Sequence, residues 1–261
     1  MTTLAPPTSN AAKGSWRLPA PPLRGRVLAA AGFGCLAVAG LALFVQSWLG
    51  TAPTQPLIAV AVFAAMIAVA TLTMRDHHSF PHFGAANWVT MVRGVLVALA
   101  ASLIAEPAKS SFGWMLIAVT ATVAALDGID GWLARRTRMS SAFGARFDLE
   151  TDAFFMLVLS ALVWRHGKAG VWVLAIGLMR YAFVAAGWLW PWLARPLRST
   201  RRGKAVAVWQ LVALGVALLP VVPASAGMLL CGVALATLAW SFAIDVRFLY
   251  KKEHGPTAVL S

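Results

Sequence analysis

The chain contains eight apolar segments joined by short connections, and this feature restricts the possible folds more than any other. The segments cover residues 27–49, 56–74, 87–105, 112–134, 144–164, 170–194, 204–222 and 225–249. A helix of about 20 residues crosses a hydrocarbon core of about 30 Å. The apolar runs are continuous, whereas the strands of a membrane barrel alternate between apolar and polar residues. We therefore predict an all-α fold, a polytopic membrane helix bundle.

The basic residues indicate the topology of this bundle. Alternate connections differ in charge: one set carries most of the lysines and arginines, and the other set has only Lys109, Arg165 and Lys168. Short cytoplasmic connections are normally the basic ones. We therefore expect a multi-pass protein of the cytoplasmic (inner) membrane with both termini in the cytoplasm. Residues 1–26 are expected to form a disordered basic cytoplasmic lead, and residues 251–261 a cytoplasmic tail.

The net charge of +13 does not indicate nucleic-acid binding here. The basic residues lie in short connections between apolar segments, where they set topology and attract anionic lipid headgroups. Cys35 and Cys231 lie inside apolar segments and lack the spacing of metal ligands, so we interpret both as small apolar side chains. No internal repeat is visible, and we expect one domain.

Five of the nine acidic residues lie between positions 127 and 152. Asp127 and Asp130 are three residues apart, and Asp148 and Asp152 are four apart, so each pair shares one face of a helix. The short connection between the pairs predicts antiparallel neighbouring helices whose four carboxylates converge. Carboxylates this close must take up protons or hold cations, and ligand sets made only of oxygen favour Mg²⁺, Mn²⁺ or Ca²⁺.

Small residues and an arginine accompany these acids. Gly131, Ala134 and Gly144 leave room for a ligand to approach closely, and Arg135 offers a planar fork suited to phosphate. Together with a metal, they suggest a site for a diphosphate. Buried ion pairs among the acids, Arg135 and Arg146 are the alternative, but ion pairing alone would not require so many acids.

Another polar group lies at the start of the segment 87–105. Asn87, Thr90 and Arg93 are spaced by three residues and therefore share one helical face. They are either binding residues or a helix cap, a threonine bonded to its own helix and an arginine that extends to the membrane surface.

The acidic stretch resembles the signature of the CDP-alcohol phosphotransferase family of membrane phospholipid synthases. It reads Asp127-x2-Asp130-Gly131-x2-Ala134-Arg135-x8-Gly144-x3-Asp148-x3-Asp152. The group Asn87-x2-Thr90-x2-Arg93 is similar to a second element of that family. The resemblance covers residues 85–250 and implies a six-helix core, with residues 27–84 forming two additional N-terminal transmembrane helices.

The resemblance also implies a reaction and roles for residues. A hydroxyl of an acceptor alcohol attacks the β-phosphate of a CDP-linked lipid, and CMP leaves. Two divalent cations, Mg²⁺ or Mn²⁺, would be held by Asp127, Asp130, Asp148 and Asp152, and Asp152 would also remove the proton of the acceptor. The cytidine and diphosphate would be bound by the small and polar residues described above: Asn87, Thr90, Gly131, Ala134, Arg135 and Gly144. Homodimers occur in the family and are possible here.

Four basic residues are candidates for binding the phosphate of a phosphorylated acceptor such as glycerol 3-phosphate: Arg180, Arg201, Arg202 and Lys204. Arg180 is a lone cation in an apolar segment, and such cations usually face the interior of a bundle. The basic stretch 195–204 has a second interpretation, contact with anionic lipids. Glu150 lies outside the signature and either pairs with Arg138 or Arg146 or influences the choice of acceptor.

The expected function is transfer of a phosphatidyl or related group from a CDP-activated lipid, such as CDP-diacylglycerol, to an alcohol in phospholipid biosynthesis. Two alternatives predict other products. A variant enzyme would transfer a polar head group from a soluble CDP-alcohol to a lipid hydroxyl. A cation transporter or metal-binding membrane protein would release no nucleotide. The sequence does not identify the acceptor.

Overall fold

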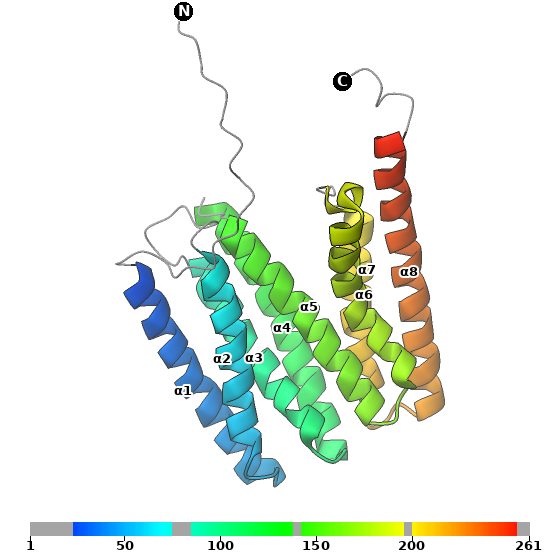
Figure 1. Ribbon diagram of the computed structural model, residues 1–261. Helices are drawn as coiled ribbons and strands as arrows, with labels where there is room; N and C mark the ends of the chain where they lie inside the picture. Colours follow the sequence, from blue (N-terminus) through cyan, green and yellow to red (C-terminus); the bar gives the residue numbers. More distant parts are fainter. Residues whose placement is uncertain (1–22, 75–84, 138–141, 196–199, 255–261) are drawn as a thin grey trace, which may run out of the picture.

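The computed structural model describes residues 23–74, 85–137, 142–195 and 200–254. Within these ranges the chain forms eight α-helices and three short 3₁₀ helices, and no strand (Figure 1). The predicted lead up to residue 22, the connection 75–84 and the tail beyond residue 254 lie outside the described residues. The α-helices, in chain order, are α1 (Leu23–Leu49), α2 (Gln55–Met74), α3 (Ala85–Ser102), α4 (Ser110–Thr137), α5 (Ala142–Arg165), α6 (Leu174–Leu189), α7 (Arg201–Ala217) and α8 (Ala224–His254).

The eight helices correspond to the eight predicted segments, so the all-α fold is confirmed. The segment predicted at 170–194 is the exception, because it divides into η2 (Val171–Val173), α6 and η3 (Pro191–Ala194). Pro191 explains the second break: the residue before a proline disfavours helical backbone angles, and Trp190 is extended, with φ −123° and ψ 92°. The segment 87–105 likewise ends in a 3₁₀ turn, η1 (Leu103–Ala105).

Five stretches of the described chain are long and apolar enough to cross a membrane: Leu28–Leu49, Trp88–Ala105, Ser110–Ile129, Val171–Leu189 and Ala224–Glu253. The protein is therefore a multi-pass membrane helix bundle. The apolar stretch of α2, Gln55–Ala70, is shorter, the start of α5 carries Asp148, Glu150 and Asp152, and α7 has only 17 residues. For α2, α5 and α7 a full crossing stays a prediction.

The helix α3 lies at the centre of the arrangement. It packs against α1, α2, α4 and α5, and 67% of its membrane-length window is buried, against 22–33% for the other four. The helices α6, α7 and α8 lie together on the far side of α5 (Figure 1). The outer helices expose large apolar side chains such as Leu229 and Trp188, as expected for surfaces that face lipid.

The ends of the helices alternate along the bundle. Figure 1 shows that α3 begins, α4 ends, α5 begins and α8 ends at the same end of the molecule. The first residues of α7 also lie there, so the acidic stretch and the basic residues that open α7 share one end. We call it the acidic end.

The hairpin formed by α1 and α2 is fixed to the rest of the protein at the opposite end. The Nζ atom of Lys109 donates to the carbonyl oxygens of Leu49 at 3.0 Å and Gly50 at 2.7 Å, the last turn of α1. The backbone N–H of Ala52 donates to both carboxylate oxygens of the buried Glu106, at 3.1 Å. The Lys109 contacts satisfy carbonyl groups at the end of α1 that lack intrahelical partners, and the Glu106 contact fixes the loop between α1 and α2.

Close packing also joins α5 and α6. A β-carbon at Gly177 would lie 2.8 Å from the backbone nitrogen of Leu157. The absence of a side chain at this glycine therefore allows the two backbones to approach, as small residues commonly do between membrane helices.

We predict that Glu106→Ala destabilises the docked hairpin. Removing the buried carboxylate that accepts from the Ala52 N–H should cost about 1.5–3 kcal/mol, the usual contribution of a hydrogen bond to a charged group, which should lower the melting temperature of the detergent-purified protein. The matched control is Glu253→Ala, which removes an ion pair with Arg195 whose two side chains are 33% and 42% exposed. Pairs of that kind contribute about 0–1 kcal/mol. Equal shifts for the two variants would contradict the role given to Glu106.

Candidate metal centre

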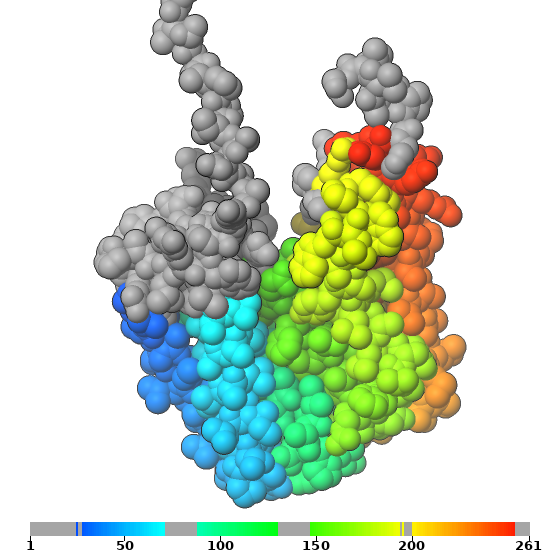
Figure 2. All heavy atoms as spheres, viewed as in Figure 1, coloured from blue at the N-terminus to red at the C-terminus, as the bar shows by residue number. Residues whose placement is uncertain are grey.

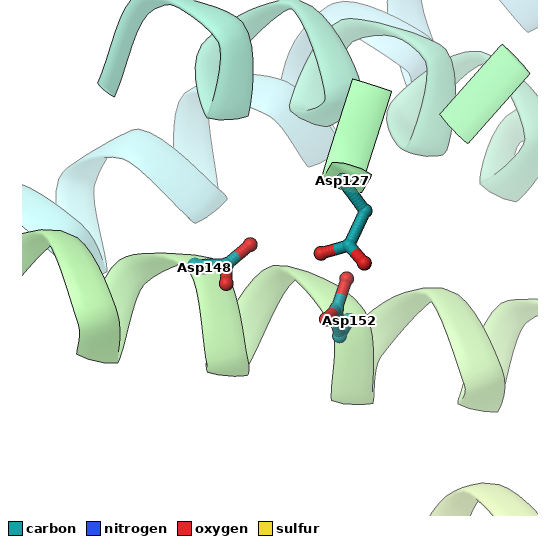
Figure 3. A group of neighbouring side chains, drawn as sticks. All are labelled: Asp127, Asp148 and Asp152. Atoms are coloured by element: carbon teal, nitrogen blue, oxygen red, sulfur yellow. The ribbon is translucent and has the colours of Figure 1, made fainter. Parts of the chain in front are cut away.

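Three aspartates converge at the acidic end of the bundle. Asp127 comes from the second half of α4, and Asp148 and Asp152 come from the first half of α5. One carboxylate oxygen of each lies within 4.8 Å of the others, and the three side chains point toward one another (Figure 3). The predicted convergence is therefore present for these three. Asp130 is also in α4, but its side chain lies outside the described part of the structure.

The helices α4 and α5 reach this arrangement through α3. Both pack extensively along α3, and in the described residues they make little direct contact with each other. The predicted antiparallel arrangement is present, since α4 ends and α5 begins at the same end of the molecule (Figure 1). The acidic side chains extend toward each other from two helices that a third one supports.

Arg93 of α3 provides the positive charge inside the cluster. Its side chain is fully buried, and its Nη1 atom lies 3.4 Å from Asp127 Oδ1. The same Nη1 donates a hydrogen bond to Asp148, and Nη2 donates one to Asp152. Arg93 therefore does not extend to the membrane surface, which was one of the two interpretations of its position.

Arg93 is one of the three residues at the start of this helix that were considered as binding residues, but no contact with the acids was predicted for it. A signal was available, because a cation within an apolar helix usually faces the bundle interior and pairs with acids.

The donor set fits a hard divalent cation. All three candidate ligands are carboxylates, and their side chains are 50% (Asp127), 35% (Asp148) and 41% (Asp152) exposed, so a ligand can reach them from outside. Oxygen donors of this type suit Mg²⁺, Mn²⁺ or Ca²⁺. In the described part of the chain, no other group of three or more potential ligands meets the same distance limit.

Of the residues predicted to bind the nucleotide, only Thr90 has a described side chain. It is buried, 2% exposed, one turn before Arg93 on α3. Asn87, Gly131, Ala134, Arg135 and Gly144 lie in the first turn of α3, the end of α4 and the start of α5, and their side-chain positions are outside the described part. The backbone nevertheless brings all six positions to the acidic end.

Glu150 pairs with Arg180. The Nη2 atom of Arg180, in α6, donates to Glu150 Oε1 at 2.6 Å. Glu150 was predicted to pair with Arg138 or Arg146. Arg138 and the side chain of Arg146 lie outside the described part of the structure. Glu150 is two residues from both Asp148 and Asp152, so it points roughly 200° away from them around α5. Asp148 and Asp152 therefore face α3, while Glu150 faces α6.

The remaining candidate cations are in the first turn of α7. Arg202 forms an ion pair with Asp245 of α8, and its guanidinium carbon lies 5.9 Å from the ring centre of Trp240. Arg201 and Lys204 are exposed. Thr200 caps α7 by accepting a hydrogen bond from the Gly203 N–H at 3.0 Å.

Figure 2 shows atoms of α5 (green) at the surface between α2 (cyan) on one side and α6 and α7 (yellow) on the other.

Comparison with known proteins assigns the same region a family. Residues 83–243, from just before α3 to within α8, match the family model described as CDP-alcohol phosphatidyltransferase. A Pseudomonas fluorescens protein named CDP-diacylglycerol–glycerol-3-phosphate 3-phosphatidyltransferase is 32% identical over 181 residues, covering 65% of this chain and 89% of that protein. No solved structure matches.

We predict that Asp148→Asn weakens binding of Mn²⁺ to the purified protein. Loss of one charged ligand should reduce the affinity by at least about tenfold, since even outer-shell changes cost about 10- to 100-fold. Binding can be measured by the electron paramagnetic resonance of free Mn²⁺. Asp245→Asn is the control, because Asp245 pairs with Arg202 outside the cluster. Equal affinity in the wild type and Asp148→Asn would exclude Asp148 as a ligand.

Proposed function

The chain belongs to the CDP-alcohol phosphatidyltransferase family, and we propose that it transfers a phosphatidyl group from CDP-diacylglycerol to glycerol 3-phosphate. The observation that carries the proposal is the convergence of Asp127, Asp148 and Asp152 inside the family match. As a member of this family, the protein is a membrane enzyme that takes a CDP-activated lipid as donor and an alcohol as acceptor. The named Pseudomonas relative supports the choice of these two substrates.

The acidic cluster suits the donor because CDP-diacylglycerol carries a charged diphosphate. We propose that Asp127, Asp130, Asp148 and Asp152 hold two divalent cations, Mg²⁺ or Mn²⁺. Such cations offset the charge of a diphosphate and of the departing phosphate. The proposed nucleotide residues, Asn87, Thr90, Gly131, Ala134, Arg135 and Gly144, belong to α3, α4 and α5, and the acids belong to α4 and α5.

Asp152 is proposed as the general base. The acceptor oxygen forms a bond to the β-phosphorus, the bond from that phosphorus to the oxygen of CMP breaks, and the hydroxyl proton passes to the carboxylate. Asp152 is 41% exposed, so a hydroxyl can approach it from outside the bundle. Its contact with the buried Arg93 holds the carboxylate in one orientation.

The acceptor phosphate is proposed to bind Arg180, Arg201, Arg202 and Lys204. Arg180 and Arg202 belong to α6 and α7, on the side of α5 opposite α3, and each already pairs with one carboxylate. A phosphate that binds there must share the arginine with Glu150 or Asp245, or replace the carboxylate. Arg201 and Lys204 are exposed and can bind either the acceptor or anionic lipid headgroups.

The cellular arrangement follows from the charge pattern. We propose the inner membrane as location, with the acidic end and both termini facing the cytoplasm, because the basic connections gather at that end. Glycerol 3-phosphate would then reach the site from water, and the donor would reach it from the bilayer. The homodimer expected from the family stays a prediction.

The test of the proposed function is CMP release by the purified, detergent-solubilised protein. We predict release from CDP-diacylglycerol with Mg²⁺ and glycerol 3-phosphate, little release with serine, inositol or inositol phosphate, and none after chelation. Asp152→Asn should lower the rate by about 100-fold or more, the usual contribution of a general base.

Other outcomes would identify the alternatives. Reaction of CDP-choline or CDP-ethanolamine with diacylglycerol would make this a head-group transferase. Cation flux in proteoliposomes without CMP would indicate a transporter. A normal rate for Asp152→Asn would overturn the assignment of the base.

A separate prediction concerns Arg180. Arg180→Gln should raise the KM for glycerol 3-phosphate by about 10- to 100-fold, because a hydrogen bond to a charged group contributes about 1.5–3 kcal/mol. The KM for CDP-diacylglycerol should change by less than about twofold. Arg165→Gln is the matched control, since Arg165 donates to the carbonyl of Ile104 at the far end of α5. An unchanged KM for glycerol 3-phosphate would remove Arg180 from the acceptor site.

A further inference from the structure

Arg93 has an unusual environment for an arginine. It is fully buried and is the largest of the fully buried side chains in the described chain. Its neighbours on α3, Met91 and Val95, are buried apolar residues. An ionised guanidinium in such a place costs several kcal/mol unless acidic partners compensate it. The carboxylates of Asp127, Asp148 and Asp152 provide that compensation.

Arg93 in turn reduces the repulsion among the three carboxylates. Three carboxylates with oxygens within 4.8 Å of one another repel strongly, and Arg93 offsets one of the three negative charges. Its two terminal nitrogens together contact all three acids: Nη1 lies against Asp127 and Asp148, and Nη2 lies against Asp152. Arg93 therefore links the acids of α4 with those of α5 at this end.

The oxygens bound by Arg93 are those of the proposed metal ligands. Nη1 and Nη2 each contact an Oδ1 atom, of Asp148 and Asp152 respectively. A guanidinium and a divalent cation repel each other, and both are attracted to the same carboxylates. The carboxylates can therefore gain contacts with the metal only by losing contacts with Arg93.

We propose that Arg93 is the resident counter-ion of the acidic cluster. It holds Asp127, Asp148 and Asp152 together when no divalent cation is bound, and it gives up part of these contacts when one binds. Arg93 is thus a positioning residue that lowers the affinity for metal while keeping the metal-free protein folded. The inference rests on the metal centre in the proposed function.

If Arg93 had the opposite role, its loss would change the affinity for metal in the opposite direction. If Arg93 only oriented the aspartates for the metal, its loss would weaken metal binding, as the loss of outer-shell partners generally does. The sign of the change in affinity therefore separates the two roles, and enzymatic activity is not needed to measure it.

The experiment compares the wild type, Arg93→Gln, Arg93→Lys and the control Arg165→Gln as full-length proteins in detergent. We expect Arg93→Gln to bind Mn²⁺ about tenfold more tightly than the wild type, because a neighbouring positive charge is removed. Its melting temperature with chelator should fall by about 5 °C or more, and Mn²⁺ should raise it by more than it raises that of the wild type. Arg93→Lys should show smaller changes in the same directions, and the control should match the wild type.

The remaining outcomes decide against the inference. Mn²⁺ affinity equal to or below that of the wild type in Arg93→Gln would overturn it, and if that variant does not fold, the same result in Arg93→Lys would do so. Failure of the wild type to bind Mn²⁺ would overturn the metal centre as well. A wild type that binds Mn²⁺, with variants that bind no more tightly, would reject the role of Arg93 alone.

Discussion

The contact between the buried guanidinium of Arg93 and three carboxylates determines how the acidic end is built. In the described residues, the helices α4 and α5 have little contact with each other, and the acids that they carry meet around a side chain of α3. Neither partner would be tolerated alone, since an unpaired buried cation and three adjacent carboxylates are both costly. The charges that hold the three helices together are also those proposed to act on the substrate.

The helix α5 separates two kinds of polar contact. Asp148 and Asp152 face α3, whereas Glu150 faces α6 and binds Arg180. A helix turns by about 100° per residue, so the single sequence Asp148-x-Glu150-x-Asp152 serves both faces. The close approach of α6 at Gly177 continues the same contact farther along the helix. One helix thus connects the proposed donor site with the cations of the other half of the bundle.

The sequence was sufficient to predict the helices because apolar runs of about 20 residues allow few other structures in a membrane. It was also sufficient to predict that Asp127, Asp148 and Asp152 converge, because helical spacing and a short connection limit their positions. The sequence was not sufficient to predict which charged side chains form ion pairs. Glu150 could reach several arginines in principle, and only the packing of α5 on α6 selects Arg180. A cation in an apolar segment indicates that Arg93 faces the bundle interior, but which acids it contacts depends on how four helices pack around α3. The break before Pro191 could have been predicted from the residue type alone.

The attachment of the α1–α2 hairpin restricts the directions from which a lipid can approach the site. Both helices pack along α3 and are fixed by Lys109 and Glu106 at the end away from the acids. On that flank, α1 and α2 therefore separate α3 from the acyl chains of the surrounding lipid. We therefore expect the lipid substrate to approach from the flank that α1 and α2 do not cover.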